Sequence, residues 1–216
     1  MNYYTADLHL NSVRNVEFRP FTDVNEMNSI ICENIARRVS KYDTLYILGD
    51  VGSCSNIPYK MLRALKCTKI LIVGNNDIIP LKNNDKAGKK FKECFYRIYY
   101  GNYTTYDDGI WNNICMCHYP MASWNGSRSG VPLFFGHVHT RTDDGYEPMK
   151  FVPNAFNVGV DVTGYMPVTA REVIGLDPIP KREDIGLPRH DRINEYMEKI
   201  KPYHFMYPHA CRTVIP

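Results

Sequence analysis

Residue types that bind divalent metal ions follow several apolar runs of this chain. They fall in five short motifs: Asp7-Leu8-His9, Gly49-Asp50, Gly74-Asn75-Asn76-Asp77, His118-Tyr119-Pro120 and Gly136-His137-Val138-His139. A carboxylate can bridge two ions, an imidazole binds one, and an amide oxygen is a neutral ligand. A set without cysteine suits Mn, Fe, Zn or similar ions better than a structural zinc site. Two such ions roughly 3.5–4 Å apart would clamp a phosphoryl group and make a bridging hydroxide at neutral pH.

Polar residues are common at strand ends, so each of these side chains taken alone is equally well explained as an ordinary strand end. The pattern as a whole is not explained in this way, because four of the seven histidines lie at such ends. The pattern therefore predicts a centre for two divalent metal ions.

The elements expected around the first three motifs follow a strand–helix–strand rhythm. Strands are predicted at 2–6, 44–48 and 69–73, and helices at 24–40 and from residue 58. This alternation favours a parallel sheet with right-handed crossovers, in which ligands gather beyond the C-terminal ends of the strands. Asp7, Asp50 and Asn75 should therefore converge at one sheet edge.

The second half of the chain has a different pattern. Tyrosine and threonine around a Gly101-Asn102 turn predict a hairpin over 96–107, and further short strands are expected at 114–117, 133–135 and 156–160. A last short helix is expected at 169–176. We therefore predict an α/β domain over residues 1–176, followed by a Pro-rich C-terminal extension over 177–216 that packs on it.

Bulk properties are those of an ordinary globular domain. The 216 residues are 44% hydrophobic and carry a formal net charge of +3, which is far from the basic signature of a dedicated nucleic-acid binder. The seven cysteines are odd in number and irregularly spaced, which favours reduced thiols, with Cys115 and Cys117 on one face of a strand. No signal peptide and no apolar run of roughly 20 residues is present, so we expect a cytoplasmic protein without a membrane segment.

The order and wording of the five motifs resemble the calcineurin-like metallophosphoesterase family, in particular its small bacterial and phage-type members. The resemblance runs from about residue 2 to residue 176 and includes Arg19-Pro20-Phe21 and the stretch 156–162 (FNVGVDV). It implies two mixed β-sheets packed face to face and flanked by helices. It also implies a phosphoesterase that uses a metal-bridging hydroxide.

The resemblance further implies two ligand sets with Asp50 shared between them. The first ion would be held by Asp7, His9, Asp50 and His139, and the second by Asp50, Asn75, His118 and His137. The catalytic candidates are Asp50, Asn76 and Asp77.

The third motif departs from the family pattern at Asn76, where a histidine that protonates the leaving group is usual. An amide can donate a hydrogen bond to phosphate but cannot act as a general acid near neutral pH. Because general acid catalysis contributes about 10²–10⁴ in rate, phosphodiesters or activated phosphomonoesters are the expected substrates. Asp77 remains as a possible contributor.

Substrate contacts are predicted for Asn76 and for the loop after His118, where Trp124 offers an aromatic plane and Arg128 a guanidinium. An ordinary surface loop is the plainer interpretation of 123–128. The expected partner is a phosphorylated small molecule or nucleotide-type substrate; nucleic acid is possible but not favoured. The alternative function is a metal-binding protein of this fold with little turnover that acts as a binding or scaffold protein.

Overall fold

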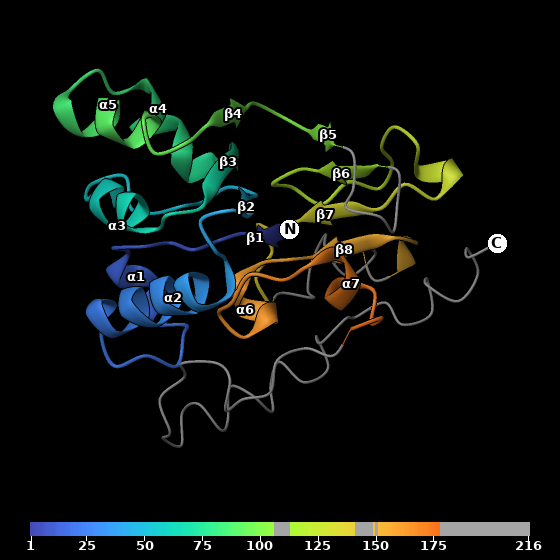
Figure 1. Cartoon of the computed structure of the whole chain (residues 1–216), viewed down its shortest axis with the longest axis horizontal. Helices are drawn as coiled ribbons and strands as arrows, with labels where there is room; N and C mark the ends of the chain where they lie inside the picture. Colours follow the sequence, from blue (N-terminus) through green and yellow to red (C-terminus); the bar gives the residue numbers. More distant parts are fainter. Residues whose placement is uncertain (106–112, 141–148, 150, 178–216) are drawn as a thin grey trace.

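Two four-stranded sheets form the centre of the computed structural model, which describes residues 1–105, 113–140, 149 and 151–177 (Figure 1). The first sheet is β1 (Asn2–Thr5), β2 (Thr44–Ile47), β3 (Thr68–Ile72) and β4 (Arg97–Tyr99), in that order. The second is β5 (Tyr103–Thr105), β6 (Ile114–Met116), β7 (Leu133–Phe135) and β8 (Ala155–Asn157). The protein is therefore of the α/β class, as predicted.

The two sheets pack against each other through a shared apolar cluster. Tyr4 and Ile72 from the first sheet lie in this cluster with Met116 and Phe134 from the second. The rings of Tyr4 and Phe134 meet edge to face with centroids 4.8 Å apart. Because successive side chains of a strand point to opposite faces, every second residue of each strand points away from this cluster.

Helices cover the outer face of the first sheet. They are α1 (Val13–Val16), α2 (Val24–Arg38), α3 (Tyr59–Ala64), α4 (Ile78–Lys82) and α5 (Lys86–Lys92). Two short helices follow late in the chain, α6 (Val160–Thr163) and α7 (Ala170–Val173), and α7 places Ala170 and Val173 in the cluster shared by the two sheets. Helix α2 buries Met27 and Ile31 in the same cluster as Leu45 and Ile47 of β2. Burial on both faces explains why β2 is an almost continuous apolar run.

The start of α2 is capped by the residue before it, Asp23. The side chain of Asp23 accepts hydrogen bonds from the backbone N–H groups of Asn25 and Glu26. Glu26, however, accepts from the backbone N–H and the hydroxyl of Thr22 instead of completing a capping box with Asp23.

The predicted hairpin over 96–107 is wrong. Strand β4 pairs in parallel with β3, whereas β5 pairs antiparallel with β6 in the other sheet. The turn at Gly101 (φ +86°) is present, but it carries the chain from one sheet to the other. Local composition predicts the strands and the turn. It does not predict which strand each one pairs with, because the available sheet edges are formed by strands distant in the sequence.

The two sheets also differ in the directions of their strands. Every strand pair of the first sheet is parallel, with one isolated antiparallel bridge between Tyr4 and Val168. The second sheet is mixed, because β5 is antiparallel and its other pairs are parallel. The expectation of two mixed sheets thus holds in full only for the second.

The cysteine prediction is confirmed where the structure describes it. Cys115 and Cys117 lie in one apolar cluster and Met116 in another, as strand alternation requires. The six described cysteines are free thiols. Among the described helices, none is long and apolar enough to cross a membrane. The predicted C-terminal extension lies outside the described residues after Asp177.

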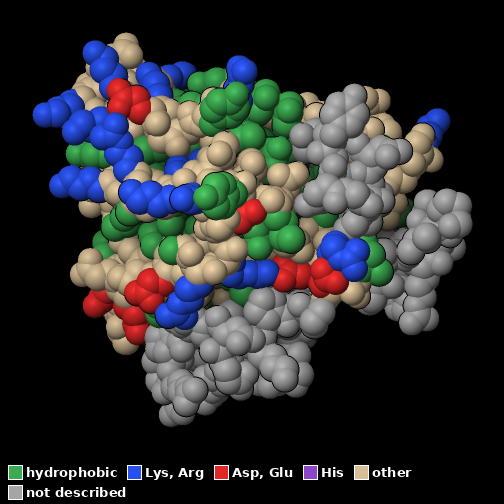
Figure 2. Space-filling view, in the orientation of Figure 1, with side chains coloured by type: hydrophobic (Ala, Val, Ile, Leu, Met, Phe, Trp, Pro, Cys, Tyr) green, Lys and Arg blue, Asp and Glu red, His purple; other side chains and the backbone are tan. Residues whose placement is uncertain are grey.

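One face of the molecule carries a group of basic side chains over α3 and α5 (Figure 2). Lys89, Lys90 and Lys92 belong to the last turn of α5, where positive charge complements the helix dipole. The ammonium of Lys90 lies 5.2 Å from the ring centroid of Tyr59.

Candidate metal centre

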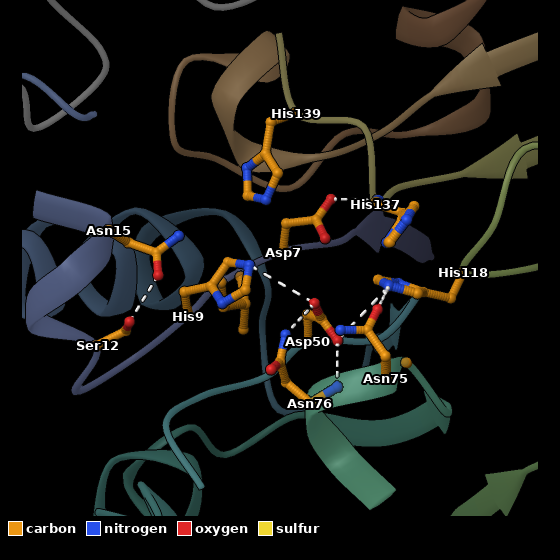
Figure 3. A network of polar contacts seen from close by, with 12 residues as sticks. Asp7, His9, Ser12, Asn15, Asp50, Asn75, Asn76, His118, His137 and His139 are labelled. Atoms are coloured by element: carbon orange, nitrogen blue, oxygen red, sulfur yellow. Dashed lines mark hydrogen bonds and ion pairs between the residues drawn. The ribbon is translucent and has the colours of Figure 1, made fainter. Parts of the chain in front are cut away.

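The loops after five strands bring the seven predicted ligands into one space. Asp7 and His9 follow β1, Asp50 follows β2, Asn75 follows β3, His118 follows β6, and His137 and His139 follow β7. Their side chains point toward one another in Figure 3. The His9 and His139 rings stack with centroids 5.1 Å apart, and the His118 and His137 rings lie 5.0 Å apart. The structure thus assembles all seven.

Five of these ligands have a left-handed backbone conformation that non-glycine residues rarely adopt. The φ values are +58° at Asp7, +48° at His9, +55° at Asp50, +73° at His137 and +51° at His139. Each such residue costs on the order of 1–3 kcal/mol and persists only when its surroundings hold it. Backbone bonds between the motifs supply part of that support, from Asp7 N to Gly49 O and from His9 N to Asp50 O. Such a concentration of strain is typical of functional sites.

Asp50 lies between two imidazoles. Its Oδ2 is 3.7 Å from Nε2 of His9, and its Oδ1 is 3.5 Å from Nε2 of His118. The Oδ1 atom of Asn75 is 3.0 Å from the same nitrogen of His118. Each carboxylate oxygen of Asp50 therefore faces a different histidine, which is the arrangement required of a bridging ligand.

Two groups of side chains have ligand atoms close enough to hold an ion. In one, the ligand atoms of Asp7, His9 and His139 lie within 4.8 Å of one another, and in the other so do those of Asp7, Asp50 and His118. These groups share Asp7, whereas the resemblance gives the shared position to Asp50. Asp7 is thus a member of both groups, and Asp50 faces a histidine of each group, His9 and His118.

Two buried atoms in this space have no hydrogen-bond partner in the described structure, Oδ1 of Asp7 and Nε2 of His9. Burying a polar atom without a partner is costly, and more so for a carboxylate. Burial also lowers the pKa of the His9 imidazole well below its usual value, so it is neutral at pH 7. A cation would satisfy both atoms, and the residues present therefore fit a metal ion.

Burial raises the pKa of the Asp7 carboxyl to about 6, although the neighbouring His139 and His118 act to lower it. In the unfolded chain the same carboxyl loses its proton near pH ~3.9. Between these values the folded state holds the additional proton, so this group makes the metal-free protein less stable as the pH rises from about 4 to about 6. A bound cation displaces that proton, so metal affinity should rise over the same interval.

Asp77 has a structural role that the sequence did not indicate. Its Oδ2 accepts hydrogen bonds from the backbone N–H groups of Asp50 and Gly74, both at 2.9 Å, and its Oδ1 accepts from Val51 at 3.0 Å. Burial raises its pKa to about 6, although the three N–H donors act to lower it. The side chain does not line the cavity described below. Asp77 therefore ties the second motif to the third.

Asn76 contacts Asp50 twice. Its backbone N–H donates to Oδ1 of Asp50 at 2.9 Å, and its side-chain Nδ2 donates to Oδ2 at 2.6 Å (Figure 3). The side chain is half-buried and lines the cavity, so it can also reach a bound molecule. Both groups are donors without an acidic proton, which agrees with the chemistry expected of an amide.

Glycines in the motifs allow this close approach. A Cβ atom on Gly136 would lie 2.6 Å from Oδ2 of Asp7, and one on Gly49 would lie 2.5 Å from Nδ1 of His118. Gly49 also has a φ of +84°. The lack of space for a side chain therefore explains the glycines before Asp50 and His137, and turn geometry is a second reason at Gly49.

A cavity of about 890 Å³ opens beside the candidate metal centre. Its walls include several of the predicted ligands and Asn76 (His9, Asp50, Asn75, Asn76, His137 and His139). Arg14, Asn15 and Phe18, in and just after α1, form another part of the wall. Arg14 and Phe18 are exposed, so a guanidinium and an aromatic ring are available to a bound molecule. Sequence reasoning missed them because only the tertiary structure brings α1 to the site.

The structure does not bring Trp124 and Arg128, for which substrate contacts were predicted, to the wall of this cavity. Trp124 is only 8% exposed, packs in the apolar cluster with Leu133 and Phe135, and donates from Nε1 to Val131 O at 2.7 Å. Arg128 is exposed, but it does not line the cavity. The indole ring packs against the apolar residues of β7, so it does not reach the site.

The guanidinium of Arg19 and the carboxylate of Asp161 form a buried pair beside His139. Nε of Arg19 donates to Oδ1 of Asp161 at 2.8 Å and Nη2 to Oδ2 at 2.7 Å, while Nδ1 of His139 lies 2.5 Å from the same Oδ2. Burial alone would raise the pKa of Asp161, yet Arg19 and His139 outweigh it and hold that pKa well below its usual range. Burial acts to lower the pKa of His139, but the hydrogen bond with Asp161 and the charges of Asp161 and Asp7 outweigh it, and the pKa lies above its usual value.

Comparison with known proteins identifies relatives without assigned functions. No protein-family model matches the chain. It is 28% identical over 177 residues to the uncharacterized protein MJ1445 of Methanocaldococcus jannaschii, and the match spans 81% of this chain and 89% of that protein. The crystal structure of the protein of unknown function AQ665 from Aquifex aeolicus superposes with a TM-score of 0.61 at 24% identity, over 82% of this chain and 99% of that one. The chain thus shares its fold with this protein of unknown function.

Proposed function

We propose that this chain is a dinuclear metal-dependent phosphoesterase of the calcineurin-like type, with its two sheets as the αββα sandwich of that family. The observation that carries the proposal is the place of Asp50, whose two carboxylate oxygens face His9 and His118 separately at 3.7 and 3.5 Å. A carboxylate in this position is suited to two ions. The unpartnered buried atoms of Asp7 and His9 support the same interpretation.

The proposed ligand sets are those implied by the resemblance to the calcineurin-like family. Asp7, His9, Asp50 and His139 would hold one ion, and Asp50, Asn75, His118 and His137 the other. Two bound ions such as Mn²⁺ would supply Lewis acidity toward a phosphoryl oxygen and would lower the pKa of water to near neutrality.

The other residues of the chain act by orientation and charge. Asn76 donates one amide hydrogen to Oδ2 of Asp50, and its second amide hydrogen would stabilise negative charge on a phosphoryl oxygen without supplying a proton to the leaving group. Arg14 adds a positive charge at the cavity wall. Phosphodiesters or activated monoesters, with good leaving groups, are the substrates that this set of residues favours.

The test is hydrolysis of a nitrophenyl phosphodiester with added Mn²⁺. We expect turnover by the wild-type protein and its loss in Asp50→Ala. Asp85→Ala is the matched control, because Asp85 caps α5 by accepting from Gly88 N and makes the same chemical change away from the cavity. Turnover that survives Asp50→Ala would contradict the proposal.

A second candidate function rests on Asn76, which leaves the site without the usual proton donor. The protein would then bind metal and a phosphorylated partner with little turnover, as a binding or scaffold protein. Two bound ions by metal analysis, combined with no hydrolysis with any divalent ion, would favour this candidate over the first.

A further inference from the structure

The starting observation is the environment of Arg19, a guanidinium that is 2% exposed and surrounded by acceptors. Besides its two bonds to Asp161, Arg19 donates from Nη2 to the backbone carbonyl of Asp7 at 2.6 Å and from Nη1 to that of Leu8 at 3.0 Å. It therefore binds the turn that holds the first motif, where Asp7 and His9 are both in the left-handed conformation.

The same ion pair also contacts the imidazole of His139. Asp161 is only 5% exposed, at the start of α6, and its Oδ2 is shared between Arg19 and Nδ1 of His139. A carboxylate held by two guanidinium bonds is an acceptor only, so Nδ1 of His139 carries the hydrogen and Nε2 keeps its lone pair. A hydrogen bond of this kind fixes both the tautomer and the ring orientation of a metal-binding histidine.

We propose that Arg19 and Asp161 are positioning residues that build one of the two metal sites, the one that takes Asp7, His9 and His139. A single buried ion pair thereby connects residues that are 142 positions apart and aligns ligands from two different motifs. The inference rests on the proposed function only in taking the centre to be a metal site, and it concerns ion binding rather than turnover.

The test measures Mn²⁺ binding by isothermal titration calorimetry in a double-mutant cycle. Wild type is expected to bind two ions. Asp161→Asn, which keeps the shape but removes the charge, is expected to weaken one of them about 10–100-fold, the usual effect of losing a partner of a metal ligand. His139→Ala should weaken the same site. Asp161→Asn should cause a smaller loss in the His139→Ala background than in wild type, because the part of its effect that is transmitted through the imidazole is then already missing.

The matched control is Glu172→Gln. Glu172 is also a buried carboxylate paired with an arginine, Arg38, which donates in addition to the backbone carbonyl of Pro167 at 2.8 Å. This variant loses a comparable ion pair away from the site and should retain both Mn²⁺ affinities. An equal loss in Glu172→Gln, or an additive loss of Asp161→Asn in the His139→Ala background, would show general destabilisation and overturn the proposal. Unchanged affinity in Asp161→Asn would overturn it as well.

A measurement on the wild-type protein covers the case in which Asp161→Asn does not fold. Nitrogen-15 NMR of the histidine side chains in EDTA should show His139 as the Nδ1–H tautomer, with its signal assigned by its absence in His139→Ala. The Nε2–H tautomer would refute the proposal. Wild type that binds no divalent ion would refute the proposed function instead, so the two failures are distinguishable.

Discussion

Gly136→Ala is the substitution whose effect on the metal centre follows most directly from the geometry. The added Cβ would lie 2.6 Å from Oδ2 of Asp7, and it would meet the Cβ of Ala6 at even shorter range on the side of β1. Ala6 is fully buried, so the loop after β7 cannot relieve the clash by moving toward the first sheet. The carboxylate of Asp7 must therefore shift.

The size of that shift sets the expected loss of affinity. Ordinary contact between carbon and oxygen begins near 3.0–3.4 Å, so Oδ2 of Asp7 must move by about 0.4–0.8 Å from its 2.6 Å position. Metal–ligand distances tolerate only about 0.2 Å. We therefore expect Mn²⁺ affinity at the Asp7 site to fall about 10–100-fold, and the metal-free protein to lose about 1–3 kcal/mol of stability through overpacking.

The assay combines calorimetric Mn²⁺ titration with urea unfolding in EDTA, and Gly88→Ala is the control. A Cβ on Gly88 would lie 2.7 Å from the Cβ of Asn83, away from the cavity. That variant should also lose stability through overpacking, although the better helix propensity of alanine within α5 should offset part of the loss. It should bind Mn²⁺ like wild type. If Gly136→Ala binds Mn²⁺ as tightly as Gly88→Ala, Asp7 is not a ligand and the reasoning fails.

Three further predictions concern pH, the proton donor and the cavity wall. Because burial raises the pKa of Asp7 to about 6 and the Asp161 hydrogen bond raises that of His139, both groups carry a proton at pH 5 that a cation must displace. Mn²⁺ affinity should therefore be lower at pH 5 than at pH 7.5, which calorimetry checks, and equal affinities would contradict this. Asn76→His should raise the rate on poor leaving groups up to about 10²–10⁴-fold more than on nitrophenol, and an equal gain on both would argue against the general-acid account. Arg14→Ala should raise KM for a phosphodiester by about tenfold, the effect of one charge-assisted contact. Arg128→Ala should leave KM unchanged, since that side chain does not line the cavity, and the opposite order of effects would refute the assignment of this wall.

The sequence by itself determined which residue types meet and at which edge. Asp7, Asp50 and Asn75 each follow an apolar run, and the strand–helix rhythm specifies parallel neighbours whose C-terminal ends lie together. That argument needs only local patterns and the handedness of crossovers, which are general properties of polypeptides. It succeeds because the ligands are encoded next to the elements that carry them.

The tertiary structure alone decided how the side chains are held. The left-handed turns at Asp7 and Asp50 depend on hydrogen bonds between distant motifs, and Asp77 became a backbone acceptor because three N–H groups from two loops converge on it. The pairing of Arg19 with Asp161 spans 142 residues, and no periodicity in the chain encodes it. Hydrophobic patterns and turn signals act over a few residues, whereas these contacts depend on the packing of two sheets. The sequence therefore predicted which side chains converge but not the residues that support them.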